Sequence, residues 1–132
     1  MATAKFSGKI EGWDETTISE LGSGGKVTQA SVRQSFSGDV EGAGSVEWLM
    51  CYRPDQTAEF VGMQRVVGRV GDRSGSFVML QTDGTFDGQI AKGRLTIVPG
   101  SGTDELAGLS GGGEFHAPLG GQPSVELEYE VG

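Results

Sequence analysis

Apolar and polar residues alternate with a period of two along most of this chain. The clearest case is the stretch from Gly42 to Gly84, where three alternating runs are joined by tight turn sequences. Successive side chains of a strand point to opposite faces, so each run predicts a strand with one apolar face. Further strands are predicted over 2–13, 27–36, 86–98 and 124–131, with a short one around Phe115.

The segment 53–57, with the sequence RPDQT, predicts the first turn of the central stretch. Proline fixes φ at the first corner, and aspartate favours a local side-chain hydrogen bond to the backbone. A three-residue loop over 54–56 then places Trp48 opposite Gly62. We prefer this register to that of a two-residue loop, which would flip one strand, because an indole needs the space that a glycine leaves.

The segment 70–73, with the sequence VGDR, predicts the second turn. Gly71 at the first of two central positions fits a type II′ hairpin. The resulting register pairs Gly62 with Gln81 and Gln64 with Met79, so both turns predict the same inward face. That face carries Val46, Trp48, Met50, Tyr52, Phe60, Gly62, Gln64, Val66, Phe77, Met79 and Gln81.

The remaining segments are less regular. Residues 13–26 read as an irregular connection that could cover one mouth of a barrel, and Asp83-Gly84 reads as a hairpin turn. The apolar set that follows is out of phase with that turn, which predicts a bulge over 86–88. The sequence TDELAGL predicts one helical turn capped by Thr103. The inward set of the run 27–36 is Thr28, Ala30, Val32, Gln34 and Phe36.

Together these elements predict an all-β fold with at most one short helical turn, in a single domain over residues 1–132. A closed antiparallel barrel of about eight strands leaves no edge unpaired and has an interior that is either filled or holds one small ligand. A sandwich of two sheets is the alternative.

Composition narrows the functional classes. The net charge is −8, from 10 basic and 18 acidic residues, which argues against nucleic-acid or anionic-membrane partners. The single cysteine, Cys51, excludes an internal disulfide framework. No apolar run is long enough for a transmembrane helix, and the first ten residues lack the apolar core of a signal peptide, so we expect a cytoplasmic location.

The run FSGDVEGAGSVEWLMCYRPDQTAEFVGMQRVVGRVGDRSGSFVMLQTDGTFDG, followed by VPGSGTDELAGLSG, resembles an uncharacterised bacterial family known as domain of unknown function 3224. The resemblance implies an allene oxide cyclase-like β-barrel, related to the lipocalin-like barrels. The family name does not imply any particular activity. The chain departs from the family pattern at Gln56, where a turn glycine is typical, and at Gln64, where glutamate is typical. It also departs near Gln81, where histidine often follows. Two amides cannot replace a glutamate–histidine acid/base pair.

The inward face is the candidate binding site for a small hydrophobic molecule, since ligand sites combine apolar walls with few polar groups. A filled interior, with the amides bonded to each other or to a buried water, is the alternative. The candidate ligand-binding residues are Trp48, Tyr52, Phe60, Gln64, Phe77, Met79 and Gln81.

Other chemistry-bearing residues give weaker candidates. His116 could be a general base at the pocket rim, although a surface histidine is the simpler interpretation. Cys51 is out of phase with the inward set. Glu47, Glu59 and the arginines at 53, 65, 69 and 73 fall on the outward face, whereas Asp104, Glu105 and Glu114 lie near a predicted barrel mouth. We expect no metal site and no cofactor, and we assign no catalytic residue.

Three functions are compatible with this pattern. The first is a barrel that binds a small apolar ligand. The second is a cofactor-independent cyclase or isomerase acting on a small polyketide- or lipid-like substrate, by shaping it rather than by acid/base chemistry. The third is a homo-oligomeric structural or interaction protein, because outward residues are too apolar for a free surface. Those outward residues are Val61, Met63, Val67, Val78 and Leu80, and packing under the connection over 13–26 is the alternative to a subunit contact.

Overall fold

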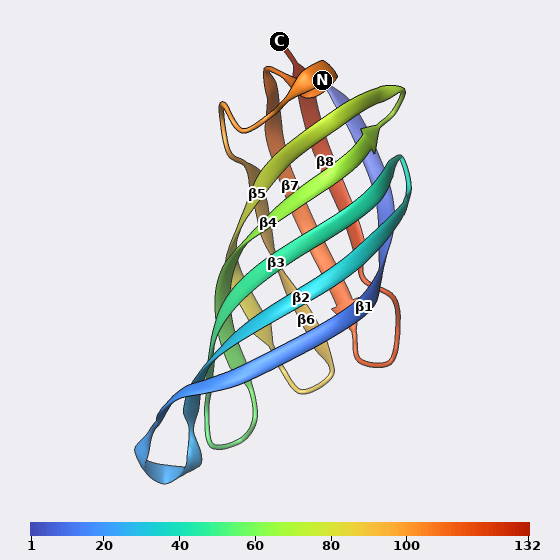
Figure 1. Ribbon diagram of the computed structural model, residues 1–132. Coiled ribbons are helices and arrows are strands. Elements are labelled where there is room, and N and C mark those ends of the chain that lie inside the picture. Colours follow the sequence, from blue (N-terminus) through green and yellow to red (C-terminus); the bar gives the residue numbers. More distant parts are fainter.

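The computed structural model describes residues 1–132 and is a closed antiparallel barrel in which each strand pairs with the next and β8 pairs with β1 (Figure 1). The predicted fold class is therefore confirmed, and the sandwich alternative is wrong. Two single-turn 3₁₀ helices, η1 (Gly22–Gly24) and η2 (Asp104–Leu106), are the helical elements. The strands are β1 (Ala2–Glu20), β2 (Lys26–Gly38), β3 (Val40–Tyr52), β4 (Ala58–Val70), β5 (Arg73–Phe86), β6 (Ile90–Ile97), β7 (Leu109–Pro118) and β8 (Ser124–Val131).

The register predicted for the central strands is confirmed. Trp48 lies opposite Gly62 on β3 and β4, and Gly62 lies opposite Gln81 on β5. A Cβ atom at Gly62 would lie 2.3 Å from Cδ1 of Trp48, so this glycine leaves the space that the indole occupies. In the first turn, the backbone N–H of Thr57 donates to Asp55 Oδ1 at 3.0 Å, as its sequence predicts.

Residues 13–26 do not form the irregular connection that their sequence suggests. β1 continues to Glu20 and pairs with β2 as far as Lys26, and this hairpin projects past the rest of the barrel (Figure 1). Register shifts occur between Ile10 and Gly12 and between residues 17 and 19. Each bulge adds one residue, so the side chains after it alternate in the opposite phase. A search that assumes one phase along the whole strand therefore misses the alternation. Trp13 thereby lies opposite Val32, on the inward face.

The hairpin predicted at Asp83-Gly84 is also wrong. β5 runs through this position to Phe86, and the bulge lies between Thr82 and Thr85 rather than over residues 86–88. The turn follows at Asp87, whose Oδ1 accepts hydrogen bonds from two backbone N–H groups, at 2.8 and 2.9 Å. Asp83 has a φ of 53°, so an Asp-Gly pair here makes a bulge instead of a turn.

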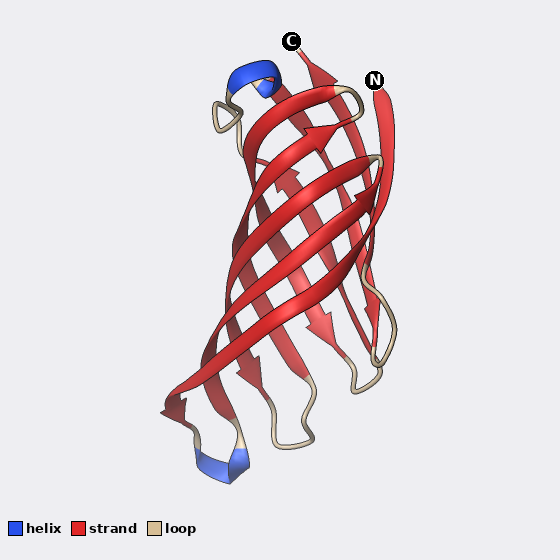
Figure 2. Ribbon diagram, turned by 45° about the vertical axis from the view of Figure 1, so that its right-hand side comes forward, coloured by secondary structure: helices blue, strands red, loops and turns tan.

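The helical turn at 104–106 is confirmed, but Thr103 does not cap it. Its hydroxyl instead accepts a hydrogen bond from the backbone N–H of Ser76, at 3.0 Å. The segment thereby covers the end of β5 that extends beyond its pairing with β6. The helical turn η2 lies at the barrel end near both termini (Figure 2), and its Leu106 is fully buried. That end is packed with apolar side chains, including Val66, Val70, Phe77, Met79, Ile97 and Leu109.

Candidate functional site

A cavity of about 300 Å³ lies inside the other half of the barrel. Its walls come mainly from apolar and aromatic side chains, and none of the side chains that line it is charged. The loop after β7, from Leu119 to Gly121, lies at its mouth. The cavity is at the lower end of the size range of ligand pockets and equals roughly ten water volumes of ~30 Å³ each.

Five of the seven candidate ligand-binding residues line this cavity, namely Trp48, Tyr52, Phe60, Gln64 and Gln81. Phe77 and Met79 also point inward, but they do not line it. They are 1% and 0% exposed and belong to the packed half of the interior. The face of a strand tells whether a side chain points into the barrel. Whether that side chain then lies in the packed half or lines the cavity depends on all the strands of the closed barrel.

The polar groups of the cavity form a directed chain of hydrogen bonds. Trp48 Nε1 donates to Gln81 Oε1, and Gln81 Nε2 donates to Gln64 Oε1 at 3.1 Å. Gln64 Nε2 is buried and has no hydrogen-bond partner. Gln34 lines the same cavity and its side-chain amide forms no hydrogen bond within the protein. The amides thus bond each other in part, and the NH₂ groups of Gln64 and Gln34 are left without a partner in the protein.

A second polar cluster joins the projecting part of β1 to β2 and β3. Glu15 Oε1 accepts a hydrogen bond from Trp13 Nε1 at 2.9 Å, and its Oε2 accepts one from the hydroxyl of Thr28 at 2.7 Å. The ring of Trp13 lies 5.6 Å from that of Trp48 and lines the cavity. Lys26 Nζ lies 5.6 Å from the ring centroid of Tyr52. This cluster therefore holds an indole over the cavity.

The electrostatics of this cluster favour a charged Glu15 and a neutral Tyr52. Burial raises the pKa of Glu15, but hydrogen bonds from Thr28, Trp13 and Tyr52, with the charge of Lys26, outweigh it and leave this pKa below its ordinary value. Burial, and then the neighbouring Glu15 carboxylate, raise the pKa of Tyr52 to about 12. Neither shift moves a proton-transfer group toward neutral pH, so this pair is poorly suited to acid/base catalysis.

Trp13, Glu15 and Gln34 are site residues that the sequence pattern did not bring into the candidate site. Gln34 belongs to the predicted inward set of its strand, so alternation was a sufficient signal for it. Trp13 and Glu15 lie after the bulge at 10–12, where the phase changes. The β-branched run Thr16-Thr17-Ile18 was the signal that could have revealed a strand there.

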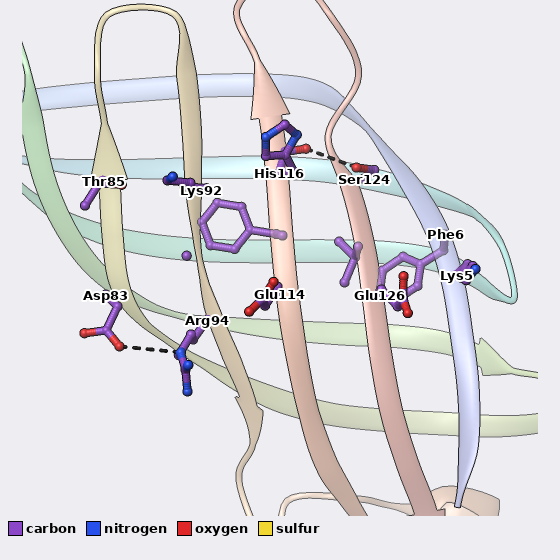
Figure 3. A pocket seen from close by; sticks show the side chains of 13 residues that line it. Lys5, Phe6, Asp83, Thr85, Lys92, Arg94, Glu114, His116, Ser124 and Glu126 are labelled. Atoms are coloured by element: carbon purple, nitrogen blue, oxygen red, sulfur yellow. Dashed lines mark hydrogen bonds and ion pairs between the residues drawn. The ribbon is translucent and has the colours of Figure 1, made fainter.

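The acid/base candidates at the predicted mouth do not reach the cavity. Asp104 and Glu105 lie at the opposite end of the barrel, beside Leu106. Figure 3 shows Glu114 and His116 on β7, in a depression of the outer surface with Lys92 and Arg94. His116 is exposed, which agrees with its interpretation as a surface histidine.

That outer depression is a surface of mixed charge (Figure 3). Cross-strand pairing sets Lys5 beside Glu126 and Arg94 beside Glu114, and Arg94 Nε lies 3.9 Å from a carboxylate oxygen of Asp83. Neighbouring opposite charges of this kind are typical of ordinary exposed surface. The depression is therefore not our candidate site.

The other charged candidates also lie on the outer face. Arg69 forms an ion pair with Glu41 at 2.6 Å, and Arg53 forms one with Glu59. Cys51 is exposed and unpaired. No group of three or more histidine, cysteine, aspartate or glutamate side chains is placed to hold a metal ion.

An apolar strip crosses the outer face of β3 and β4. Leu49 pairs with Val61 across the two strands, and Met63 and Val67 follow along β4. These four side chains are roughly half exposed, and Val78 and Leu80 of β5 are partly buried beside them. The β1–β2 hairpin projects away from this face and does not cover it (Figure 1).

Fold and site together define a small closed β-barrel with an interior cavity whose walls are mostly apolar and whose polar groups are amides, indoles and one phenol. The model of the protein family of unknown function DUF3224 matches residues 2–129, and the chain belongs to that family. The structure resembles the crystal structure of a DUF3224 protein of unknown function from Shewanella oneidensis MR-1, with 28% identity and a TM-score of 0.78. The similarity covers 99% of this chain and 96% of the other.

No curated protein matches the chain at a significant level. The structure contains no helix that is both long and apolar enough to span a membrane.

Proposed function

We propose that this protein binds a small, mostly apolar molecule in the interior cavity. The observation that carries the proposal is the cavity itself, of about 300 Å³, walled by Trp48, Phe60 and other apolar side chains around a few convergent amides. The opposite half of the same barrel is packed with aliphatic and aromatic side chains. This chain therefore fills one half of its interior and leaves the other half open.

Energetics also support a bound molecule. The cavity opens to solvent beside the loop from Leu119 to Gly121, so without a ligand its apolar walls are exposed to water. Apolar walls offer that water few hydrogen bonds. A ligand with an apolar body would displace this water and contact the walls.

Binding is testable with N-phenyl-1-naphthylamine, a neutral probe whose emission rises in apolar surroundings. The blocking variant is Ala117→Phe, at a small residue that lines the cavity. The matched control is Ala107→Phe, which adds the same bulk at an exposed residue outside the cavity. We expect saturable enhancement with the parent protein and with the control, and its loss with the blocking variant. Equal binding by both variants would place the probe elsewhere, and no binding by the parent protein would refute the proposal.

Catalysis of the cyclase or isomerase type takes second place in the same cavity. The cavity could hold a reactive substrate in one conformation without any cofactor. However, Glu15 is committed to two hydrogen bonds and its pKa is lowered, so it is a weak base. We therefore give ligand binding precedence over turnover.

Self-association is a further candidate that a separate observation supports. The outward side chains of β4 follow the order Glu59, Val61, Met63, Arg65, Val67 and Arg69. A two-fold axis between residues 63 and 65 would set Val61 against Val67 of a second copy and the acidic end against the basic end. Sedimentation should then detect a dimer that Met63→Glu dissociates, and a strictly monomeric parent protein would exclude it.

A further inference from the structure

The hydrogen-bond chain in the cavity has a direction that the indole imposes. The Nε1–H of Trp48 can only donate, so Gln81 has to turn its carbonyl oxygen toward the indole. The Gln81 NH₂ group is then left to donate, and Gln64 has to accept with its own carbonyl oxygen, as the 3.1 Å contact shows. The NH₂ group of Gln64 is therefore the free end of the chain, and it is the buried atom without a partner.

This free end lies in the floor of the cavity. Gln64 lines the cavity and is 2% exposed. Its Nε2 lies beside Gly44, where a Cβ atom would approach it to 2.6 Å, and beside the edge of Phe36. Gln34 pairs with Gly44 across β2 and β3 and lines the same floor. If the carbonyl of Gln34 rotates to accept from Gln64, the chain gains one amide and still ends on an NH₂ group.

Gln64 Nε2 itself is shielded from solvent, so an entering molecule reaches this donor after a rotation of the Gln64 side chain, or meets the NH₂ group of Gln34 when Gln34 accepts from Gln64. A buried donor without a partner costs about 1–3 kcal/mol. A hydrocarbon leaves that donor unpaired. A carboxylate would accept, but no basic side chain lines the cavity, and the charge of Lys26 beside Tyr52 already offsets that of Glu15, so burying a further negative charge is unfavourable. A neutral acceptor avoids both costs.

From these features we infer that the ligand is a neutral carbonyl compound, such as a ketone, ester or lactone. Its apolar body lies against Trp48 and Phe60. Its carbonyl oxygen accepts a hydrogen bond at the floor of the cavity, either from the NH₂ group of Gln64 or, when Gln34 accepts from Gln64, from the NH₂ group of Gln34. This inference rests on the proposed function, because it names the class of molecule that the proposed binding cavity takes.

The test uses three probes of one shape, which are 2-acetylnaphthalene, 2-isopropylnaphthalene and 2-naphthoate. Their dissociation constants are measured with the parent protein and with Gln34→Met/Gln64→Met/Gln81→Met, which removes the three amides that line the cavity and keeps similar side-chain volume. We expect the ratio of ketone to hydrocarbon affinity to fall about tenfold in this variant, as expected for one hydrogen bond in a buried site. The ratio cancels the different hydrophobicities of the probes.

A measurement on the parent protein makes the test independent of how the variant folds. The side-chain NH₂ resonances of Gln64 or Gln34 should move on addition of 2-acetylnaphthalene and stay in place with 2-isopropylnaphthalene. Hydrocarbon and ketone binding with an unchanged ratio and no amide shift would overturn the inference, leave the proposed function standing and assign the donor to water. Tightest binding of 2-naphthoate would overturn the neutral ligand class. Failure of all three probes to bind the parent protein would reject both proposals.

Discussion

Replacement of Gly62 by alanine should destabilise this protein by about 3 kcal/mol. The added Cβ would lie 2.3 Å from Cδ1 of Trp48 and 2.4 Å from the backbone oxygen of Glu47. Relief of these two contacts requires movement of the indole and a shift of the β3–β4 ladder that holds the oxygen. The rings of Trp13 and Phe60 each lie 5.6 Å from that of Trp48, so movement of the indole disturbs both ring contacts.

The magnitude follows from three contributions. Overpacking in a well-packed interior costs about 2 kcal/mol. Displacing the indole breaks its hydrogen bond to Gln81 and leaves buried polar groups unpaired, at about another 2 kcal/mol. The smaller conformational entropy of unfolded alanine returns about 0.7 kcal/mol.

The assay is urea unfolding followed by tryptophan fluorescence, with Gly22→Ala as the control. A Cβ at Gly22 meets no atom within 4 Å, and its φ is not positive, so this substitution should leave stability unchanged or slightly raised. We also expect the emission maximum of folded Gly62→Ala to shift, because Trp48 changes its surroundings. A loss below about 0.5 kcal/mol, within the range of neutral surface substitutions, would refute the close packing of indole and glycine.

Three further predictions concern other parts of the fold. Because the folded-state pKa of Glu15 is lowered, its contribution to stability is present above the unfolded-state value and is lost as the pH falls through the folded-state pKa. The urea midpoint of Glu15→Gln should therefore fall less between about pH 6 and about pH 3 than that of the parent protein. Leu106→Ala should lower the free energy of unfolding by about 2–5 kcal/mol, because this side chain is fully buried at one barrel end; a loss below about 1 kcal/mol in urea unfolding would contradict that role. Gln56→Gly should raise the thermal midpoint, since Gln56 has a φ of 73° and a glycine relieves about 1 kcal/mol of strain there, whereas an unchanged or lower midpoint would argue against strain.

The sequence by itself determined most of the strands, the barrel class and the register of β3, β4 and β5. These features depend on local properties, namely the period of two and the chemistry of the turns at 53–57 and 70–73. The pairing of Trp48 with Gly62 could be read from sequence because the two turns set the register independently. Five cavity residues followed from that register alone.

Only the tertiary structure decided where the cavity begins and what stands at its mouth. Bulges on β1 and β5 changed the phase of alternation without any residue pattern that sets their position, so Trp13 and Glu15 were missed and Asp83 was misread. The depth of the cavity likewise depends on all eight strands. Phe77 and Met79 share a face with Gln64 and Gln81, but they belong to the packed half of the interior, which Leu106 from another part of the chain also fills. Alternation along one strand fixes the direction of a side chain, whereas the packing around it is a property of the closed barrel.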